Sequence, residues 1–292
     1  MPRRAIRLGR IGIIGGSGLY EIEGLRGARP VKIKTPFGRP SEDYVLGELE
    51  GIAVVFLTRH GKGHRIMPTE INFRANIYGM KMLGVERILS VSAVGSMKEK
   101  IRPGEMAIPN QFYDHTRHRA STFFGDGIVA HVSFADPVCT ELAQLILRAG
   151  QAQGVSVHEG GTYLCIEGPQ FSTRAESNIY RQWGVDVIGM TNVTEAKLAR
   201  EAEICYATLA LVTDYDCWHQ GEDDVTVEAV VAILQKNVEL AKKVIRQCIL
   251  SIPRERTCDC AYALKNAIIT SPQLISKKVK QQLKPIIGRY VK

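Results

Sequence analysis

Two carboxylates stand two residues apart directly after an apolar run, a spacing that suits proton chemistry. Asp214 and Asp216 follow Ala207–Val212. Side chains two residues apart in an extended chain lie on the same side, and repulsion between two carboxylates tends to raise the pKa of one. Such a pair can hold a proton for a leaving group or accept hydrogen bonds from an amino group. A metal-free acidic loop or a magnesium site are the alternatives, and no further Asp, Asn or Glu cluster accompanies the pair to favour the metal.

Residues that could bind an anion follow two other apolar runs. In Gly15–Gly18, backbone N–H groups of a glycine turn and the Ser17 hydroxyl could bind phosphate, although a tight structural turn is the alternative. The glycine spacing departs from G-x-G-x-x-G, so a dinucleotide site is weakly supported. Arg59 and His60 follow Val54–Leu57. A guanidinium can contact phosphate through two parallel hydrogen bonds, and an exposed basic loop is the other interpretation.

Two further segments could complete a ligand site. The small residues of Ser92–Ser96 would let backbone amides approach an anion or a sugar. Phe171 stands on a turn after an apolar run, where it could stack on a flat aromatic ligand. Thr173 and Glu176 have the spacing of a capping box, so this segment also has a purely structural interpretation as the start of a helix.

Short apolar runs alternate with helical patterns along the chain. The runs predict strands at Arg10–Ile14, Ala53–Leu57, Arg87–Ser92, Met106–Ile108, Thr162–Ile166, Val185–Gly189 and Thr208–Thr213. The helical patterns cover Thr69–Leu83, Pro137–Gln153, Thr173–Trp183, Glu195–Glu203 and Val227–Leu250. This order predicts an α/β fold of one domain, with a central mixed, largely parallel β-sheet flanked by helices. Ligands of such sheets bind at the carboxyl ends of the strands, where the polar residues named above fall.

The basic charge of the chain is concentrated at its C-terminal end. The 292 residues carry a formal net charge of +8, and residues 251–292 hold nine Lys or Arg against two acidic residues. We therefore expect residues 1–252 to form the catalytic domain and 253–292 a basic helical extension of it with a solvated face. A nucleic-acid-binding protein would explain only this tail. No apolar stretch approaches the roughly 18 residues of a membrane span, and no signal peptide is evident, so we expect a cytoplasmic protein.

The seven cysteines predict no metal site by their spacing. Cys258-Asp259-Cys260 is too closely spaced for the usual C-x2-C zinc element. A disulfide or redox role is open, but a free pair in a reducing compartment is favoured. The others stand in apolar contexts typical of buried thiols: Cys139, Cys165, Cys205, Cys217 and Cys248.

Several motifs, read together, resemble one family. They are I-G-I-I-G-G-S-G (11–18), T-P-F-G-R-P-S (Thr35–Ser41), R-H-G-x-x-H-x-I-M-P (Arg59–Pro68), E-G-P-Q-F-S-T-R-A-E (167–176), M-T-N-V-T-E-A (Met190–Ala196) and T-D-Y-D-C-W (213–218). In this order, over about residues 10–250, they resemble the 5'-methylthioadenosine phosphorylases among the trimeric purine nucleoside phosphorylases. The resemblance implies phosphorolysis of 5'-methylthioadenosine to adenine and 5-methylthioribose 1-phosphate. It implies inorganic phosphate as co-substrate, no cofactor, and a homo-oligomer, either a trimer or a dimer of trimers.

The resemblance also assigns roles to residues. Phosphate would be surrounded by Ser17, Arg59, His60, Ser92, Ala93 and Thr191, with serine at 17 and 92 where threonine is often found. Met190 would lie under the ribose, and Phe171 and Ser172 would line the base site. Asp214 would protonate or hydrogen-bond purine N7, and Asp216 would accept from the exocyclic amino group. His131 would reach the 5' end of the sugar from a neighbouring subunit.

One helix face bears on the 5' substituent. Val227, Val230 and Val231 share a face at the start of the last long helix, and could form an apolar wall for a methylthio group. A core stripe is the structural alternative.

Two other functions stay open. An enzyme of the same fold could act on 6-oxopurine nucleosides or 5'-methylthioinosine, although two acceptor carboxylates suit a 6-amino group better. A nucleotide-binding regulatory module would leave Arg59, His60 and the Asp pair without a role.

Overall fold

The structure is a computed structural model, and it describes residues 10–16, 19, 22–219 and 227–291; the side chains of 227–230 and 232 are also outside the described set. Its centre is strand β5 (Val85–Ser96). Strand β11 (Cys205–Asp214) runs parallel along one edge of β5. The other edge is shared by β1 (Arg10–Gly15), which pairs in parallel up to Ser90, and β10 (Val187–Gly189), which pairs antiparallel with Gly95 and Ser96. Between them, residues 91–94 have no strand beside them on that edge within the described part of the chain.

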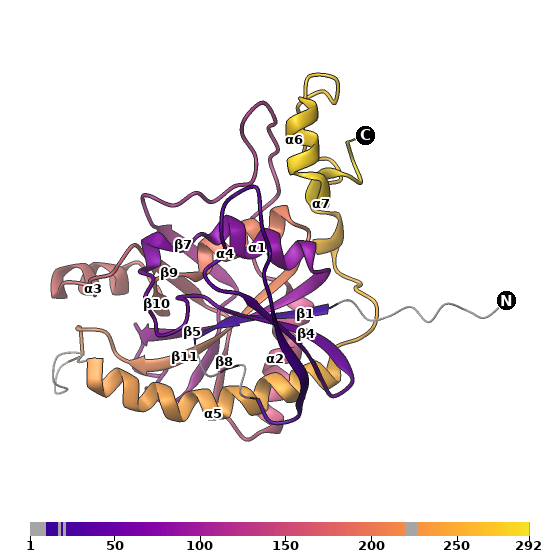
Figure 1. The fold of residues 1–292 in the computed structure, drawn as a ribbon. Coiled ribbons are helices and arrows are strands. Elements are labelled where there is room, and N and C mark those ends of the chain that lie inside the picture. Colours follow the sequence, from indigo (N-terminus) through magenta and orange to yellow (C-terminus); the bar gives the residue numbers. More distant parts are fainter. Residues whose placement is uncertain (1–9, 17–18, 20–21, 220–226, 292) are drawn as a thin grey trace.

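The remaining strands extend this mixed sheet on both sides (Figure 1). Beyond β1 lie β4 (Ile52–Thr58) in parallel, then β3 (Tyr44–Leu49) and β2 (Leu25–Val31), both antiparallel. Beyond β10 lie β9 (Thr162–Ile166) and β7 (Gln111–His115), both parallel. The short strands β6 (Met106–Ile108) and β8 (Val157–Glu159) continue from β11. The predicted mixed, largely parallel sheet is confirmed.

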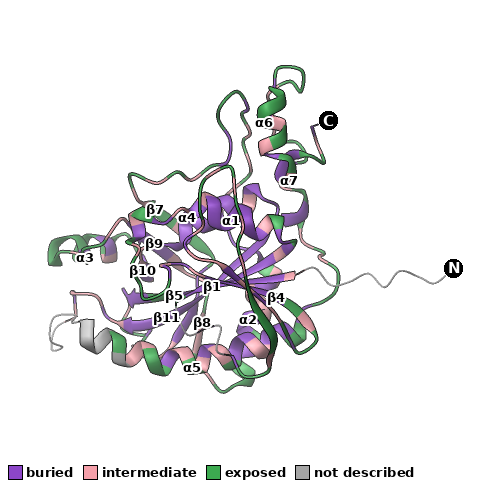
Figure 2. Cartoon of the chain, viewed as in Figure 1, coloured by how far each residue is buried: buried purple, intermediate pink, exposed green. Residues whose placement is uncertain are grey.

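Helices cover both faces of the sheet (Figures 1 and 2). Helices α2 (Thr140–Ala152) and α5 (Val227–Ser251) pack on one face, and α1 (Phe73–Met82) and α4 (Asn192–Glu201) on the other. Strand β1 shows why the apolar runs lack alternation, because Ile13 joins the core on the α2 and α5 side whereas Ile14 joins the core on the α1 and α4 side. A strand buried on both faces reads as a continuous apolar run.

Helix α3 (Arg174–Gln182) stands at the side of the sheet, and its start matches the capping-box prediction. The Thr173 hydroxyl accepts from the Glu176 backbone N–H at 3.2 Å, and a Glu176 carboxylate oxygen accepts from the Thr173 N–H at 2.8 Å. This reciprocal pair satisfies backbone donors that the first helical turn would leave free. The helix therefore begins at a fixed point directly after the loop that carries Phe171.

The structure differs from the predicted elements where context outweighs local pattern. Ser92–Ser96 was expected to follow a strand, but β5 continues through it to Ser96. Strand β2 was not predicted, because its sequence includes two arginines, a glycine and a proline and most of it is exposed.

The described part of the chain contains no helix long and apolar enough to span a bilayer.

The basic C-terminal segment contributes part of its residues to the core of the domain. Its short helices α6 (Lys277–Gln282) and α7 (Lys284–Ile287) contribute buried apolar residues to the core that also holds α1 and α4. Val279 and Ile287 are buried, whereas Lys277 and Lys278 are exposed. The lysines thus form a solvated face, as expected, and the opposite face belongs to the core.

Candidate active site

The Asp pair lies where β11 ends against β5. The backbone N–H of Asp216 donates to Asp214 Oδ1 at 2.7 Å, and the Thr213 hydroxyl donates to Asp214 Oδ2 at 2.7 Å. Asp216 has a φ of 53°, which turns the chain back toward Asp214. A Cβ on Gly95 of β5 would meet Asp214 Oδ1 at 2.8 Å, so the absence of a side chain there leaves room for the carboxylate. The two carboxylates are thus held on one tight turn.

The local environment changes the proton affinity of Asp216. Burial raises the pKa of the Asp216 carboxyl, and the charge of Asp214 raises it further, while the nearby Ser177 hydroxyl acts against the rise. A carboxyl with a raised pKa keeps its proton at a higher pH than usual. Asp216 therefore keeps a proton more readily than an exposed carboxyl, and the proton chemistry inferred from the spacing of the pair stays a prediction.

Arg59 follows β4 directly and is buried, and its main partner was not anticipated from the sequence. Its Nε donates to Glu195 Oε1 at 2.5 Å and its Nη2 to Glu195 Oε2 at 3.1 Å, in a bidentate ion pair. Nη2 also donates to Ser90 Oγ at 2.7 Å, and Nη1 to the Val91 carbonyl oxygen at 3.0 Å. A guanidinium has five N–H donors. One N–H on Nη1 therefore remains without an acceptor among the described residues. A single N–H is thus left for phosphate, whereas the sequence suggested two parallel hydrogen bonds from the guanidinium.

A buried polar network surrounds this ion pair. Glu195 Oε2 also accepts from the Tyr206 hydroxyl at 2.9 Å and from Ser90 Oγ at 3.0 Å. Asn192 donates to Thr208 Oγ1 at 2.5 Å and lies 3.4 Å from Ser90 Oγ. A buried ion pair persists only when its remaining donors and acceptors are satisfied. Glu195 and Asn192 both stand in the motif Met190–Ala196, but nothing in the spacing indicated that they face Arg59.

His60 is electrically neutral in this environment. Burial, and then the charge of Arg59, lower the pKa of His60 to about 4. Its Nδ1 lies 2.9 Å from the Ile66 carbonyl oxygen, which can only accept, so Nδ1 carries the hydrogen. The Nε2 of a neutral imidazole is then an acceptor. His64 stacks on the His60 ring with centroids 4.2 Å apart and keeps it in place.

Two of the other residues expected around phosphate lie at the gap on the edge of β5. Ser92 and Ala93 belong to the stretch without a neighbouring strand, and Ala93 is exposed although it lies in the central strand. The Ser92 hydroxyl lies 3.3 Å from the Tyr163 hydroxyl. Thr191 is buried at the N-terminus of α4, where the helix dipole favours an anion. Ser17, which also belongs to the predicted set, lies outside the described residues.

The residues expected around the ribose and base come from loops tied to the Asp pair. Cys217 Sγ donates to the Ser172 carbonyl oxygen at 3.3 Å, which joins the Ser172 loop to the turn carrying Asp216. A Cβ on Gly168 would meet Met190 Sδ at 2.5 Å, so Met190 packs directly on this backbone. Phe171 is 52% exposed, which leaves its ring free for a ligand.

Arg119 is a further residue that sequence reasoning missed. Its side chain is buried, and its Nη1 donates to the Met190 carbonyl oxygen at 2.5 Å. It also forms an ion pair with Glu167 (Nε to Oε1, 2.9 Å) and donates to the Glu167 carbonyl oxygen at 2.8 Å. Arg119 therefore joins the loop after β9 to the backbone of Met190. Its place between unremarkable residues gave no sequence signal.

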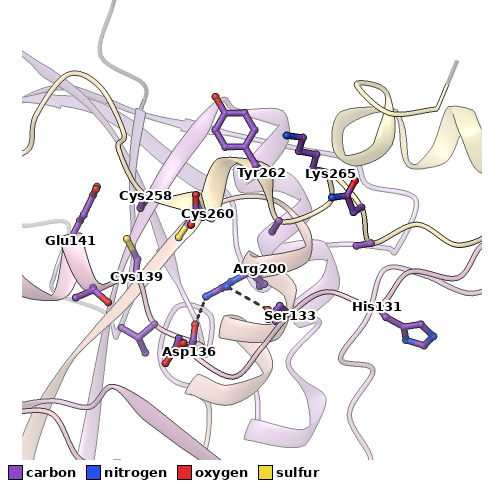
Figure 3. A pocket seen from close by; sticks show the side chains of 16 residues that line it. His131, Ser133, Asp136, Cys139, Glu141, Arg200, Cys258, Cys260, Tyr262 and Lys265 are labelled. Atoms are coloured by element: carbon purple, nitrogen blue, oxygen red, sulfur yellow. Dashed lines mark hydrogen bonds between the residues drawn. The ribbon is translucent and has the colours of Figure 1, made fainter.

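The described part of a single chain does not test two of the expected contacts. His131 is exposed and lines a different hollow of about 880 Å³, together with Arg200 and Cys258 (Figure 3). Val231 of α5 is 42% exposed, and the side chains of Val227 and Val230 lie outside the described set. The apolar wall predicted from these valines therefore stays a prediction.

Comparisons with known proteins agree with one another. Residues 10–250 match the model of the phosphorylase superfamily. The S-methyl-5'-thioadenosine phosphorylase of Geobacter sulfurreducens is 61% identical over 96% of this chain and 99% of its own. A methylthioadenosine phosphorylase from an Antarctic soil metagenomic library superposes with a TM-score of 0.92 at 52% identity, covering 96% of this chain and 99% of that one.

A more distant solved structure contains a nucleoside. It is a variant of the adenosine/methylthioadenosine phosphorylase of Schistosoma mansoni in complex with methylthioadenosine. Its TM-score is 0.79 at 36% identity, covering 88% of this chain and 96% of that one. With the fold and the motifs described above, these likenesses show that the chain belongs to the phosphorylase superfamily and, within it, to the S-methyl-5'-thioadenosine phosphorylases.

Proposed function

We propose that this protein cleaves S-methyl-5'-thioadenosine with inorganic phosphate, giving adenine and 5-methylthioribose 1-phosphate. The observation that carries the proposal is the end of β5, where Ser92 and Ala93 lie in the gap between β1 and β10 and Gly95 pairs with Asp214 at the start of the acidic turn. The names of the relatives agree with this activity. Phosphate is the co-substrate, and the reaction needs no cofactor.

Cleavage of an N-glycosidic bond separates charge in a defined direction. Positive charge develops on the ribose, and negative charge develops on the departing purine. A phosphate beside C1' offsets the first charge and then forms the new C1'–O bond as the C1'–N9 bond breaks. Because Arg59, Ser92 and Thr191 are buried, the effect on the phosphate side is stronger there than in water.

The Asp pair acts on the purine in this proposal. The pair holds one proton, which lies on Asp214 when purine N7 accepts it, so that adenine leaves as a neutral base. Asp216 then accepts from the exocyclic amino group. Burial raises the pKa of the Asp216 carboxyl, and the charge of Asp214 raises it further, which supports a proton on this turn near neutral pH. Ser172 lies next to this turn, and Phe171 is free to stack on the base.

His60 and Arg59 act on phosphate. His60 offers Nε2 as an acceptor for a P–OH hydrogen, and a bound dianion would raise the low pKa of His60 in the complex. The remaining Nη1 hydrogen of Arg59 donates to a phosphate oxygen. Ser17, Ser92, Ala93 and Thr191 complete the anion site, and Met190 lies under the ribose.

The assembly and the compartment are also proposals. We infer a homo-oligomer, a trimer or a dimer of trimers, that works in the cytoplasm without a nucleic-acid or membrane partner. His131 supports the oligomer, because its exposed side chain lines a separate hollow of its own chain and is available to a neighbouring subunit.

A product assay with and without phosphate tests the reaction. Purified protein is incubated with S-methyl-5'-thioadenosine, and adenine and the sugar product are separated by chromatography. We expect adenine and an equal amount of sugar 1-phosphate only when phosphate is present. Adenine release at the same rate without phosphate would indicate hydrolysis and overturn the proposal. Faster turnover of inosine or 5'-methylthioinosine would favour a 6-oxopurine enzyme.

A further inference from the structure

Four cysteine side chains from three separate segments converge away from the site described above. Cys139 immediately precedes α2, Cys205 begins β11, and Cys258 and Cys260 flank the start of a 3-10 helix, η2 (Asp259–Tyr262). Their four Sγ atoms all lie within 4.8 Å of one another. Cys205 Sγ and Cys258 Sγ are 3.4 Å apart. Cys139, Cys258 and Cys260 lie at the same end of the hollow in Figure 3.

The spacing of the sulfur atoms matches a tetrahedral metal better than a disulfide. Zinc–thiolate bonds of about 2.3 Å in a tetrahedron separate the sulfur atoms by about 3.8 Å. A disulfide brings two sulfur atoms to about 2.05 Å. Four cysteines with no place left for water or substrate are the donor set of a structural zinc site. The C-x-C spacing looked wrong for zinc only because the other two thiols are distant in sequence.

We propose that Cys139, Cys205, Cys258 and Cys260 together bind one Zn²⁺ ion. Each thiol releases its proton to solvent as its Zn–S bond forms. The resulting site carries two net negative charges from four thiolates and one dication. This proposal replaces the expectation that the chain has no metal site.

A buried cation beside the cluster supports a negatively charged site. Arg87 on β5 is the strand partner of Cys205 and is 3% exposed. Its Nη2 donates to the carbonyl oxygens of Pro253 and Glu255, each at 3.1 Å, in the segment leading to Cys258. Its Nη1 has no hydrogen-bond partner among the described residues, and the acid near it, Glu86, is 4.0 Å away. Buried guanidinium groups are rarely left with so little counter-charge.

The metal would join the C-terminal segment to the rest of the domain. It would link the loop after α5 to the start of β11 and to the start of α2. The chain beyond Cys260 then pairs with the His131 segment, because His131 N–H donates to the Ala267 carbonyl oxygen at 2.9 Å and Ile269 N–H to that of Val129 at 3.0 Å. Zinc therefore holds in place the backbone on which the His131 segment rests.

Metal and thiol content of the full chain test the proposal together. The protein is produced in zinc-supplemented medium and purified without a metal-affinity column or chelator. Mass spectrometry of the digested protein should find one zinc per chain, and unfolding in chelator without reductant should release seven titratable thiols. Cys258→Ser should lose at least nine-tenths of the zinc. The matched control is Cys248→Ser, which removes a thiol buried in the same core but outside the cluster and should keep one zinc.

A second measurement covers the case in which Cys258→Ser does not fold. Native wild-type protein is titrated with a mercurial reagent, and released zinc is followed with a colorimetric indicator. Zinc should leave as four thiols react, and cobalt-substituted protein should show the intense visible bands of tetrahedral thiolate coordination. Seven free thiols without zinc would overturn the proposal. Three free thiols without zinc would also overturn it, because they would indicate two disulfides. Five free thiols without zinc would indicate one disulfide, with the same consequence.

Discussion

Under the proposed reaction, Asp214 acts through the proton on its carboxyl group, and a single substitution tests this role. Asp214→Asn keeps the size of the side chain but removes the proton that N7 would accept. We expect turnover of 6-aminopurine nucleosides to fall on the order of 100-fold or more. Relative activity should shift toward inosine-type substrates, because an amide can donate to a 6-oxo group. Steady-state kinetics with adenosine and inosine measure both effects. An adenosine rate equal to that of the wild type would show that Asp214 takes no part in catalysis.

Arg59 forms an ion pair and, under the proposal, also contacts phosphate, so the two roles must be separated. Arg59→Ala should raise the KM for phosphate and also destabilise the fold by about 3–5 kcal/mol, because Glu195 would be left buried without its partner. The double variant Arg59→Gln, Glu195→Gln removes both charges. It should regain most of the unfolding free energy while the KM for phosphate stays high.

Denaturant unfolding and phosphate kinetics on the single and double variants distinguish these effects. Unchanged phosphate kinetics in both would exclude Arg59 from the anion site. A double variant as unstable as Arg59→Ala would instead show that the uncompensated charge of Glu195 is not the cause of the instability.

At the scale of elements, the last turn of α4 carries a titrating group. Glu201 is buried, and its carboxylate accepts from the Thr122 hydroxyl and the Phe123 N–H, each at 2.7 Å. Burial raises the pKa of Glu201 to about 7 from 4.5. The folded protein therefore holds this proton more tightly than the unfolded chain. The stability from Glu201 is present below about pH 4.5 and is lost as the pH rises to about 7.

Glu201→Gln serves as a control that is neutral at every pH. The unfolding free energy of the wild type, relative to this variant, should fall by up to about 3 kcal/mol between mildly acidic and neutral pH. Denaturant unfolding of both proteins from pH 5 to 8 measures the difference. A difference that does not change with pH would contradict a raised pKa at Glu201.

The first turn of α5, another single element, is predicted to set the preference for the 5' substituent of the substrate. If Val227 contacts the 5' substituent, its apolar side chain stabilises a methylthio group by roughly 1–2 kcal/mol over a hydroxyl. The wild type should then prefer S-methyl-5'-thioadenosine to adenosine by roughly 5- to 30-fold in kcat/KM. Val227→His should narrow or invert this ratio. Equal kcat/KM values in the wild type would mean that the valines only pack in the core.

At the scale of the whole molecule, activity should depend on assembly. Under the proposal, a site needs Asp214 from one subunit and His131 from the next. His131→Ala and Asp214→Asn should each impair every site of a homo-oligomer. Mixed oligomers from co-expression should contain intact sites, roughly a quarter of the total in a cyclic trimer. Activity no higher than the mean of the two parents, or a fully active monomer in sedimentation, would contradict a shared site.

Local patterns in the sequence predicted much of the fold because they depend on neighbouring residues. Met106–Ile108 and Thr162–Ile166 form strands with the predicted bounds, and α3 begins at its predicted cap. Strands β2 and β7 were missed because their exposed polar residues give no apolar run. The Asp pair was recognised because its two members are close in sequence and stand at the end of a strand.

By itself the sequence determined most of the buried strands and the long helices, which family the motifs belong to, and which residue types could meet phosphate and purine. The tertiary structure alone decided which distant residues meet. Glu195 forms a bidentate ion pair with Arg59 across 136 residues, and Cys139 and Cys205 meet a C-x-C element that looked unsuitable for a metal. The physical reason is that such pairs form where strands and loops from different parts of the chain are packed together. Spacing along the chain records which side chains share a strand or a turn, but it carries no direct record of these long-range contacts.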